Sequence, residues 1–191
     1  MPGKMKIRCL QAIKADCRRL NQYARGADAP EPSRLRYLSL ALRPEILPLL
    51  LYRFSHRAHE RRRYGWARFF YRINLFLTGA DIHPASEIGP GALMVHSVGS
   101  VIAAHIGSNA TLFAMVVIEP AWFGADLSSA PTLGDNVTVY TAATILGRIT
   151  IADDVTIGPY SLVEQSIEDA GSLFSLVPGK HTVSVIKRKT E

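Results

Sequence analysis

The chain has 191 residues, and 48% of them are hydrophobic, so it can form one core with a smaller extension and is not disordered as a whole. No apolar run is long enough to span a membrane, and the start of the sequence lacks the apolar segment of a signal peptide. The formal net charge of +6 permits nucleic acid, a membrane surface or an anionic cofactor as partner, but no nucleic-acid-binding motif is present. We therefore expect a cytoplasmic protein without a nucleic-acid partner.

Residues 1–34 form a basic leader that is compatible with a short helix over residues 5–20. Its last third, which contains Gly and Pro, is predicted to be a mobile linker. The cysteines of the leader, Cys9 and Cys17, have no histidine at zinc-like spacing. We expect both thiols to be free and reduced, and we predict no metal cofactor.

From Leu35 to Leu77, apolar residues recur three and four positions apart, which predicts two or three amphipathic helices in a domain over residues 35–78. The charged stretch His56 to Arg63 is predicted to interrupt them. Within it, Arg61 to Arg63 stand near aromatic residues. We interpret these arginines as a solvated helix end, with a membrane-surface or polyanion-binding patch as the alternative.

After Gly79 the hydrophobic period changes to six, and the residue four positions after each leading aliphatic residue is usually small or β-branched. A period of six residues places one aliphatic side chain per strand toward the interior, which suits short parallel strands stacked as a solenoid. A helix would need a period of about 3.6. The pattern predicts a mainly β protein with a β-helix over residues 79–170, followed by a tail over residues 171–191. The leading residues are Ile82, Ile88, Met94, Ile106, Leu112, Ile118, Leu133, Val139, Ile145, Ile151, Ile157 and Val163.

Five short motifs punctuate this region: GADIHPASEIGPG (79–91), HSVG (96–99), PTLGDNV (131–137), ILG (145–147) and VPGK (177–180). In this order, and with the helical segment LYRFSH (51–56) before them, they resemble the hexapeptide-repeat acyltransferases, most closely the serine O-acetyltransferase branch. The resemblance covers roughly Leu35 to Lys180.

This resemblance implies a left-handed parallel β-helix preceded by an α-helical region, assembled as a homotrimer or a dimer of trimers. It also implies that acetyl-CoA or another acyl-CoA lies in the cleft between neighbouring subunits. A hydroxyl or amine of a small-molecule acceptor would attack the thioester directly, after a histidine removes its proton.

His96 matches the catalytic histidine of the family and Asp81 the aspartate that orients it. A general base requires a pKa near the working pH, which favours histidine, and a carboxylate on the second ring nitrogen fixes the tautomer. We interpret His83 as a turn residue beside Pro84. His105 is interpreted as a surface residue at a corner, with replacement of a lost active-site group as the alternative.

Two positions depart from the serine-specific members of the family. Val95 stands where an aspartate contacts the amino acid, and Ala130 stands where a second catalytic histidine is found. We therefore expect these positions to be substrate-binding, and we expect an acceptor other than free serine.

The segment Glu119 to Thr132 breaks the six-residue period where the family commonly places an acceptor-facing loop. Its Glu119, Trp122 and Asp126 are further substrate-binding candidates, because long loops on regular scaffolds often carry function. Trp122 and Phe123 would either plug the surface of the β-helix or contact a less polar acceptor or a larger acyl group.

Cofactor-binding candidates come from the later coils and the C-terminal region. No phosphate-binding loop of the P-loop or dinucleotide type is present, so the cofactor would bind in a groove. The resemblance places Thr141, Ala142, Pro159 and Tyr160 at comparable corners, and Lys180 would meet a phosphate as a point charge.

Three hypotheses follow. The first is an acyl-CoA-dependent O- or N-acyltransferase with His96 as general base. The second is a transferase whose acyl donor or acceptor is carried on an acyl or peptidyl carrier protein, which the basic leader and Arg61 to Arg63 would suit. The third, suggested by Val95 and Ala130, is a catalytically degenerate binding or assembly subunit.

Overall fold

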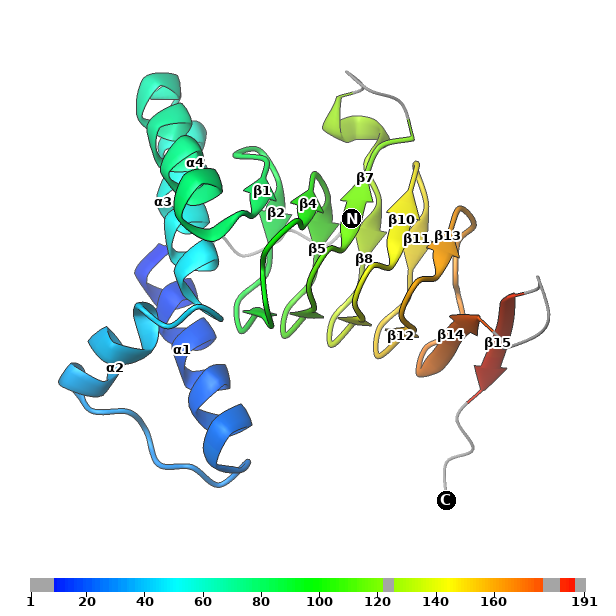
Figure 1. Cartoon of the computed structure of the whole chain (residues 1–191), viewed down its shortest axis with the longest axis horizontal. Coiled ribbons are helices and arrows are strands. Elements are labelled where there is room, and N and C mark those ends of the chain that lie inside the picture. Colours follow the sequence, from blue (N-terminus) through cyan, green and yellow to red (C-terminus); the bar gives the residue numbers. More distant parts are fainter. Residues whose placement is uncertain (1–8, 122–125, 177–182, 188–191) are drawn as a thin grey trace.

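The computed structural model describes residues 9–121, 126–176 and 183–187. A group of helices stands at one end of a three-sided prism of short strands, and a loop projects from the prism between β7 and β8 (Figure 1). None of the helices in these residues is long and apolar enough to cross a membrane.

The prism has three sheets, and each of the first four turns of the chain contributes one strand to each sheet in succession. Sheet A contains β1 (Asp81–Ile82), β4 (Val101–Ile102), β7 (Val117–Glu119), β10 (Thr144–Leu146) and β13 (Leu162–Val163). Sheet B contains β2 (Glu87–Ile88), β5 (His105–Ile106), β8 (Thr132–Leu133) and β11 (Thr150–Ile151). Sheet C contains β3 (Leu93–Met94), β6 (Thr111–Leu112), β9 (Thr138–Val139), β12 (Thr156–Ile157), β14 (Ser172–Leu176) and β15 (Val183–Lys187).

The strand pairing explains the six-residue period. Glu87 pairs with His105 and Thr138 with Thr156, in parallel and eighteen residues apart, so one coil is three hexapeptides. All twelve predicted leading aliphatic residues are buried, each at 6% exposure or less. The predicted left-handed parallel β-helix with an N-terminal helical region is thus confirmed.

Ile102 belongs to the same core, but the period of six did not predict it. Asp81 pairs with Val101, twenty residues further on, and Val101 with Val117, only sixteen further on. The corner that contains His96 is therefore two residues longer than a regular one, and the next corner is correspondingly shorter. The core position is retained although the spacing changes.

The helical region contains α1 (Cys9–Arg25), α2 (Arg34–Ala41), α3 (Leu47–Glu60) and α4 (Tyr64–Thr78). Ser33 caps α2 by accepting a hydrogen bond from the N–H of Arg36, and α4 ends at Gly79, which adopts the left-handed conformation. The sequence predicted the break between the last two helices too early, because residues 56–60 continue α3 and only Arg61 to Arg63 form the turn.

The helices close the open end of the prism. Leu49 and Tyr52 of α3 are fully buried in the same core as Ile82 and Ile88. The Tyr52 hydroxyl donates to the carbonyl of Ser86 and accepts from the N–H of Ile88. Helix α3 therefore covers apolar side chains that the first coil cannot bury by stacking on another coil.

A buried ion pair joins α1 and α3 to the first coil. The Arg53 guanidinium contacts the Asp16 carboxylate at 3.2 Å and also donates to the carbonyls of Ile88 and Gly89. Asp16 in turn accepts a hydrogen bond from the N–H of Ala92 at 3.0 Å. The network satisfies both charges and the backbone groups of the turn between β2 and β3.

Two predicted boundaries differ from the structure. Helix α1 extends to Arg25 and buries Cys17 and Leu20 against α2, so this part of the expected basic leader belongs to the helical region. At the other end, β14 pairs in parallel with β12 and continues sheet C beyond residue 170. The hydrophobic patterns of these segments are too short to reveal packing partners that are distant in sequence.

Candidate active site

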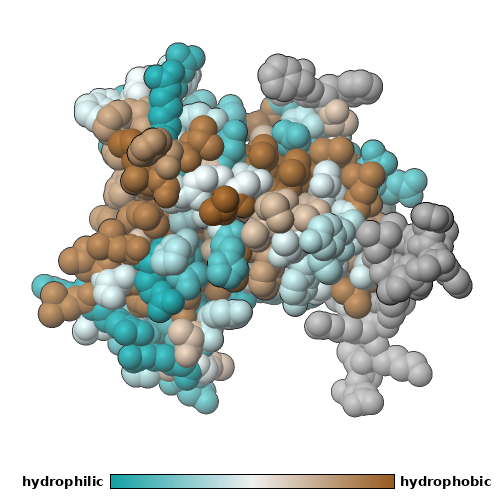
Figure 2. All heavy atoms as spheres, viewed as in Figure 1, coloured by the Kyte–Doolittle hydropathy of each residue, from teal (hydrophilic) through white to brown (hydrophobic). Residues whose placement is uncertain are grey.

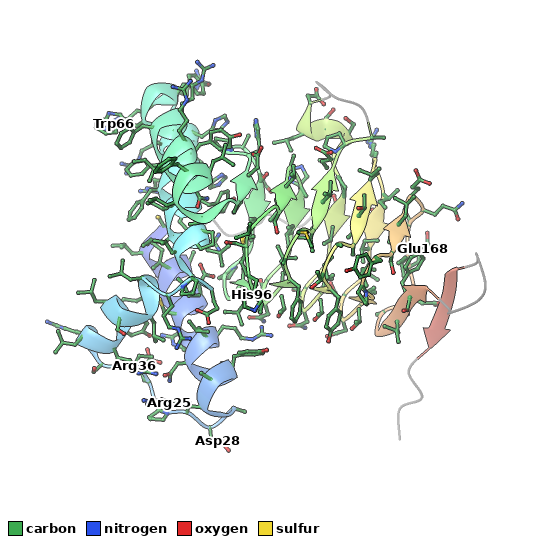
Figure 3. The ribbon with its side chains drawn as sticks, viewed as in Figure 1. Arg25, Asp28, Arg36, Trp66, His96 and Glu168 are labelled. Atoms are coloured by element: carbon green, nitrogen blue, oxygen red, sulfur yellow. The ribbon has the colours of Figure 1, made fainter. Side chains whose placement is uncertain are left out.

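His96 lies in the turn from β3 to β4, where the first coil meets the helical region (Figure 3). Its side chain is exposed and its φ of 61° lies in the left-handed region. The adjacent Ser97 hydroxyl donates to the carbonyl of Thr78 at 3.1 Å, and the N–H of Gly99 donates to the carbonyl of Gly79 at 2.9 Å. These bonds hold the turn against the end of α4.

Asp81 begins β1 next to the end of the same turn, because its N–H donates to the carbonyl of Ser100 at 2.8 Å. One carboxylate oxygen, Oδ1, accepts a hydrogen bond from the Tyr71 hydroxyl at 2.9 Å. Burial, with the bond to Asp81, raises the pKa of Tyr71 to about 12, so the phenol remains a donor. Within the described residues no hydrogen bond joins Asp81 to His96.

A second carboxylate, that of Glu45, was not predicted from the sequence. The Glu45 carbonyl accepts from the N–H of Met94 at 3.2 Å, and its carboxylate pairs with Arg43 at 3.0 Å. Burial acts to raise the pKa of Glu45, but hydrogen bonds from Arg43 and the backbone, together with coulombic interactions with Arg43 and His96, lower it. Neither Arg43 nor Glu45 stands out in the sequence, because the connection between α2 and α3 carries no motif.

Four of the predicted cofactor-binding residues lie on later coils at the same edge of the prism as His96. We call the turns from sheet C to sheet A the His96 edge (residues 95–100, 113–116, 140–143 and 158–161). The turns stack through backbone hydrogen bonds, from the N–H of Met115 to Val98, of Ala142 to Ala114, and of Tyr160 to Thr141. Thr141, Ala142, Pro159 and Tyr160 therefore continue the line that His96 begins.

Apolar and aromatic side chains line the His96 edge. Tyr160 is 69% exposed, Val98 67% and Met115 49%. The rings of Phe113 and Tyr140 stack at 4.7 Å, one and two coils above Val95. Val95 thus begins an apolar column beside His96.

The other substrate-binding candidates lie on a different edge, where turns connect sheet A to sheet B. Glu119 ends β7, and its carbonyl accepts from the N–H of Gly147 at 3.1 Å. Asp126 caps the short 3₁₀ helix η1 (Leu127–Ser129) by accepting from the N–H of Ser128 at 3.0 Å. Ala130 follows η1 and is 4% exposed. We call this the loop edge (residues 119–121 and 126–131). Trp122 and Lys180 lie outside the described residues.

His105 connects the loop edge to sheet B. Its Nε2 lies 3.2 Å from the carbonyl of Leu127 in η1, and its Nδ1 lies 3.4 Å from the Glu87 carboxylate. The side chain thus has partners on both ring nitrogens and is 28% exposed.

His83 lies in a turn, as predicted, and its Nδ1 accepts a hydrogen bond from the N–H of Ala85 at 3.2 Å. Burial and the neighbouring His59 lower the pKa of His83, while Asp81 acts in the opposite direction. The neutral ring is the form that can accept this bond. In the part of the chain that the structure describes, no group of three His, Cys, Asp or Glu side chains could hold a metal ion.

The fold is that of the left-handed β-helical acyltransferases. No family model matches the chain. The serine acetyltransferase of Helicobacter pylori is 37% identical over 133 residues, which cover 69% of this chain and 77% of that protein.

Solved structures agree with this similarity. Soybean serine acetyltransferase, solved as apoenzyme and complexed with serine, aligns with a TM-score of 0.76 and 25% identity, over 93% of this chain and 69% of that one. Serine acetyltransferase from Neisseria gonorrhoeae aligns with a TM-score of 0.78 over 96% of this chain and 68% of that one, and its 24% identity supports the fold alone. The chain belongs to the serine acetyltransferase family of hexapeptide-repeat acyltransferases, and it is an acyltransferase.

Proposed function

We propose that the protein transfers an acetyl group from acetyl-CoA to a hydroxyl of a small polar acceptor, with His96 as general base. The observation that carries this proposal is the His96 edge, where His96 lies on the first of four stacked turns and the four described cofactor-binding candidates lie on the third and fourth. A linear cofactor laid along this edge would bring its thioester to His96 at one end.

In the proposed reaction the Nε2 or Nδ1 of neutral His96 accepts the proton of the acceptor hydroxyl as its oxygen attacks the thioester carbonyl. The tetrahedral intermediate collapses, the C–S bond breaks, and the protonated histidine returns the proton to the leaving thiolate. Asp81 would orient the ring through its second oxygen, Oδ2, since only Oδ1 is bonded to Tyr71.

The active site of this proposal combines two subunits. Glu119, Asp126 and Ala130 lie on the loop edge and His96 on another edge of the same prism. A trimer with cyclic symmetry would bring the loop edge of one subunit to the His96 edge of the next. Both sets of candidates would then face one cleft, in the cytoplasm, where the free thiols of Cys9 and Cys17 would remain reduced.

The acceptor must carry a nucleophilic hydroxyl, and L-serine is the first to test. The sequence-based expectation of an acceptor other than free serine gains no support from the comparisons, because the relatives are named for serine. The comparisons give no support to a carrier protein either. Val95 and Ala130 would then require other groups to hold the polar ends of the acceptor. The Arg43–Glu45 pair is a candidate, because the Glu45 carbonyl accepts from the N–H of Met94, two residues before His96.

The test measures acetyl transfer from acetyl-CoA through the release of the free thiol, and it compares the wild type with His96→Ala and Asp81→Asn. We expect each to lower kcat by about 10²- to 10⁴-fold, because general-base catalysis contributes that much. Tyr71→Phe is the matched control, since it removes one phenol donor to the Asp81 carboxylate but leaves both His96 and Asp81 in place, so it should lower kcat less than either of the other variants. Wild-type turnover in His96→Ala would refute the mechanism. Undetectable binding of acetyl-CoA to the wild type by calorimetry would favour a binding or assembly subunit.

A further inference from the structure

The outer side of α4 carries large apolar side chains that no other described element covers. Phe76 is 88% exposed, Leu77 60%, Trp66 58% and Phe69 50%. The hollow along this side is lined by residues of α4 alone. Trp66 points away from the coils (Figure 3), and apolar atoms gather over α4 below a hydrophilic tip (Figure 2). We call these residues, with Arg68 and Arg72 of the same hollow, the α4 face.

The charge around the α4 face is strongly positive. Arg68 and Arg72 line the hollow with the apolar residues, and a second hollow at the tip of the α3–α4 hairpin combines Arg57, Arg61 and Arg63 with three aromatic residues and Ala58. Residues 47–78 contain seven arginines and a single acidic residue, Glu60. Within the described residues, the ion pair that involves this hairpin is the buried pair of Arg53 with Asp16.

We propose that the α4 face binds the surface of a lipid bilayer that contains anionic phospholipids. Arginine side chains extend their apolar stems along a hydrophobic surface and place the guanidinium at the phosphate level, while Trp and Phe insert at the boundary of the acyl chains. Each basic residue near such a surface adds electrostatic attraction to the anionic lipids. The 15 residues of α4 would lie in the interface plane over about 22 Å.

The charges favour a bilayer over a second copy of this chain. A symmetric contact between two α4 faces would bring the arginines of one copy against those of the other, and like charges at an interface oppose association. An anionic bilayer neutralises the same arginines while it covers the apolar side chains. The proposed catalytic cleft lies along the coils, so this inference does not depend on it.

Flotation of the full-length protein with vesicles of phosphatidylcholine alone, and of phosphatidylcholine with phosphatidylglycerol, tests the proposal. We expect binding to the anionic vesicles only, weakened at least tenfold both in Trp66→Ser/Phe76→Ser and in Arg68→Glu/Arg72→Glu. The control variant Leu10→Ser/Tyr23→Ser removes two apolar residues that are 69% and 62% exposed on α1, and it should bind like the wild type.

Three results would overturn the proposal. Equal binding of Trp66→Ser/Phe76→Ser and the wild type would mean that charge alone attracts the protein. Absence of binding to either vesicle by a folded wild type would exclude the surface. A smaller oligomer of Trp66→Ser/Phe76→Ser in sedimentation velocity would identify the α4 face as a contact between copies. Acetyl transfer in solution should be unchanged in these variants, which separates this test from that of the proposed function.

Discussion

Single residues in this protein are constrained by the neighbouring coil. Gly107 follows β5 in the turn between sheets B and C, and a Cβ built on it would lie 2.5 Å from the carbonyl oxygen of Gly134 in the next coil. Gly89 meets Gly107 at the same distance one coil earlier. The glycines at these turns therefore allow adjacent coils to approach closely. The sequence motif indicates that glycine is required here, but only the stacking of the coils identifies the atoms that a larger residue would meet.

Gly107→Ala should destabilise the fold by about 1–3 kcal/mol, because the backbone of the adjacent coil cannot move away as a flexible side chain would. The matched control is Gly65→Ala in the first turn of α4, where no atom lies within 4 Å of the added Cβ. It should be neutral or stabilising by up to about 1 kcal/mol, since alanine is the better helix former. Urea unfolding followed by circular dichroism measures both. Equal stability of Gly107→Ala and the wild type would contradict the close stacking.

His83 should make stability depend on pH. Its pKa in the folded protein is lowered, chiefly by burial, so the unfolded chain takes up the proton first, near its ordinary pKa of about 6.5. The stability associated with neutral His83 is complete above that pH and is lost as the pH falls from there through the lower pKa of the folded protein. His83→Asn keeps an acceptor for the N–H of Ala85 without titrating. The variant should lose less stability than the wild type between neutral and mildly acidic pH, and an identical loss would remove His83 as the cause.

At the scale of elements, the helical region and the first coil depend on each other. Helix α3 connects them through the side chains of Tyr52, Arg53 and His56, and the last of these lies 2.9 Å from the carbonyl of Pro84. The periodicity of the sequence predicted helices here. It could not predict that Arg53 is buried, because its partner Asp16 lies on another helix and 37 residues away.

Asp16→Ala should cost about 3–5 kcal/mol of unfolding free energy, since it leaves the buried Arg53 guanidinium without its counter-charge. The exposed pair Arg18–Glu31 provides the control, and Glu31→Gln should change stability little. The double variant Asp16→Leu/Arg53→Met should recover part of the loss, because it removes both buried charges. A small effect of Asp16→Ala would mean that water or other groups already compensate Arg53.

On the scale of the whole molecule, the candidate active-site residues are divided between two edges of one prism. A single chain presents His96 on one edge and the loop that carries Ala130 on another. The assembly therefore decides whether these residues form one site. A subunit-mixing experiment can measure this directly.

Two inactive variants provide the experiment. One is His96→Ala, and in the other residues 120–131 are replaced by the two-alanine connection that joins β4 to β5 at residues 103–104. If each site uses His96 of one subunit and the loop of its neighbour, random mixing in equal amounts should restore about one quarter of wild-type activity. Unfolding and refolding the two variants together ensures exchange of subunits. Mixed trimers without activity would place both elements of the site in the same chain.

The sequence by itself determined the β-helix. A buried residue at every sixth position is a local requirement of each coil, so the pattern can be recognised without knowing which strands pair. It also determined the family and marked His96 and Asp81. Tertiary structure alone decided that Ile102 completes the core, that Asp16 pairs with Arg53, and that Glu45 lies near His96. These contacts join residues from separate elements, and no repeating pattern in the sequence encodes them.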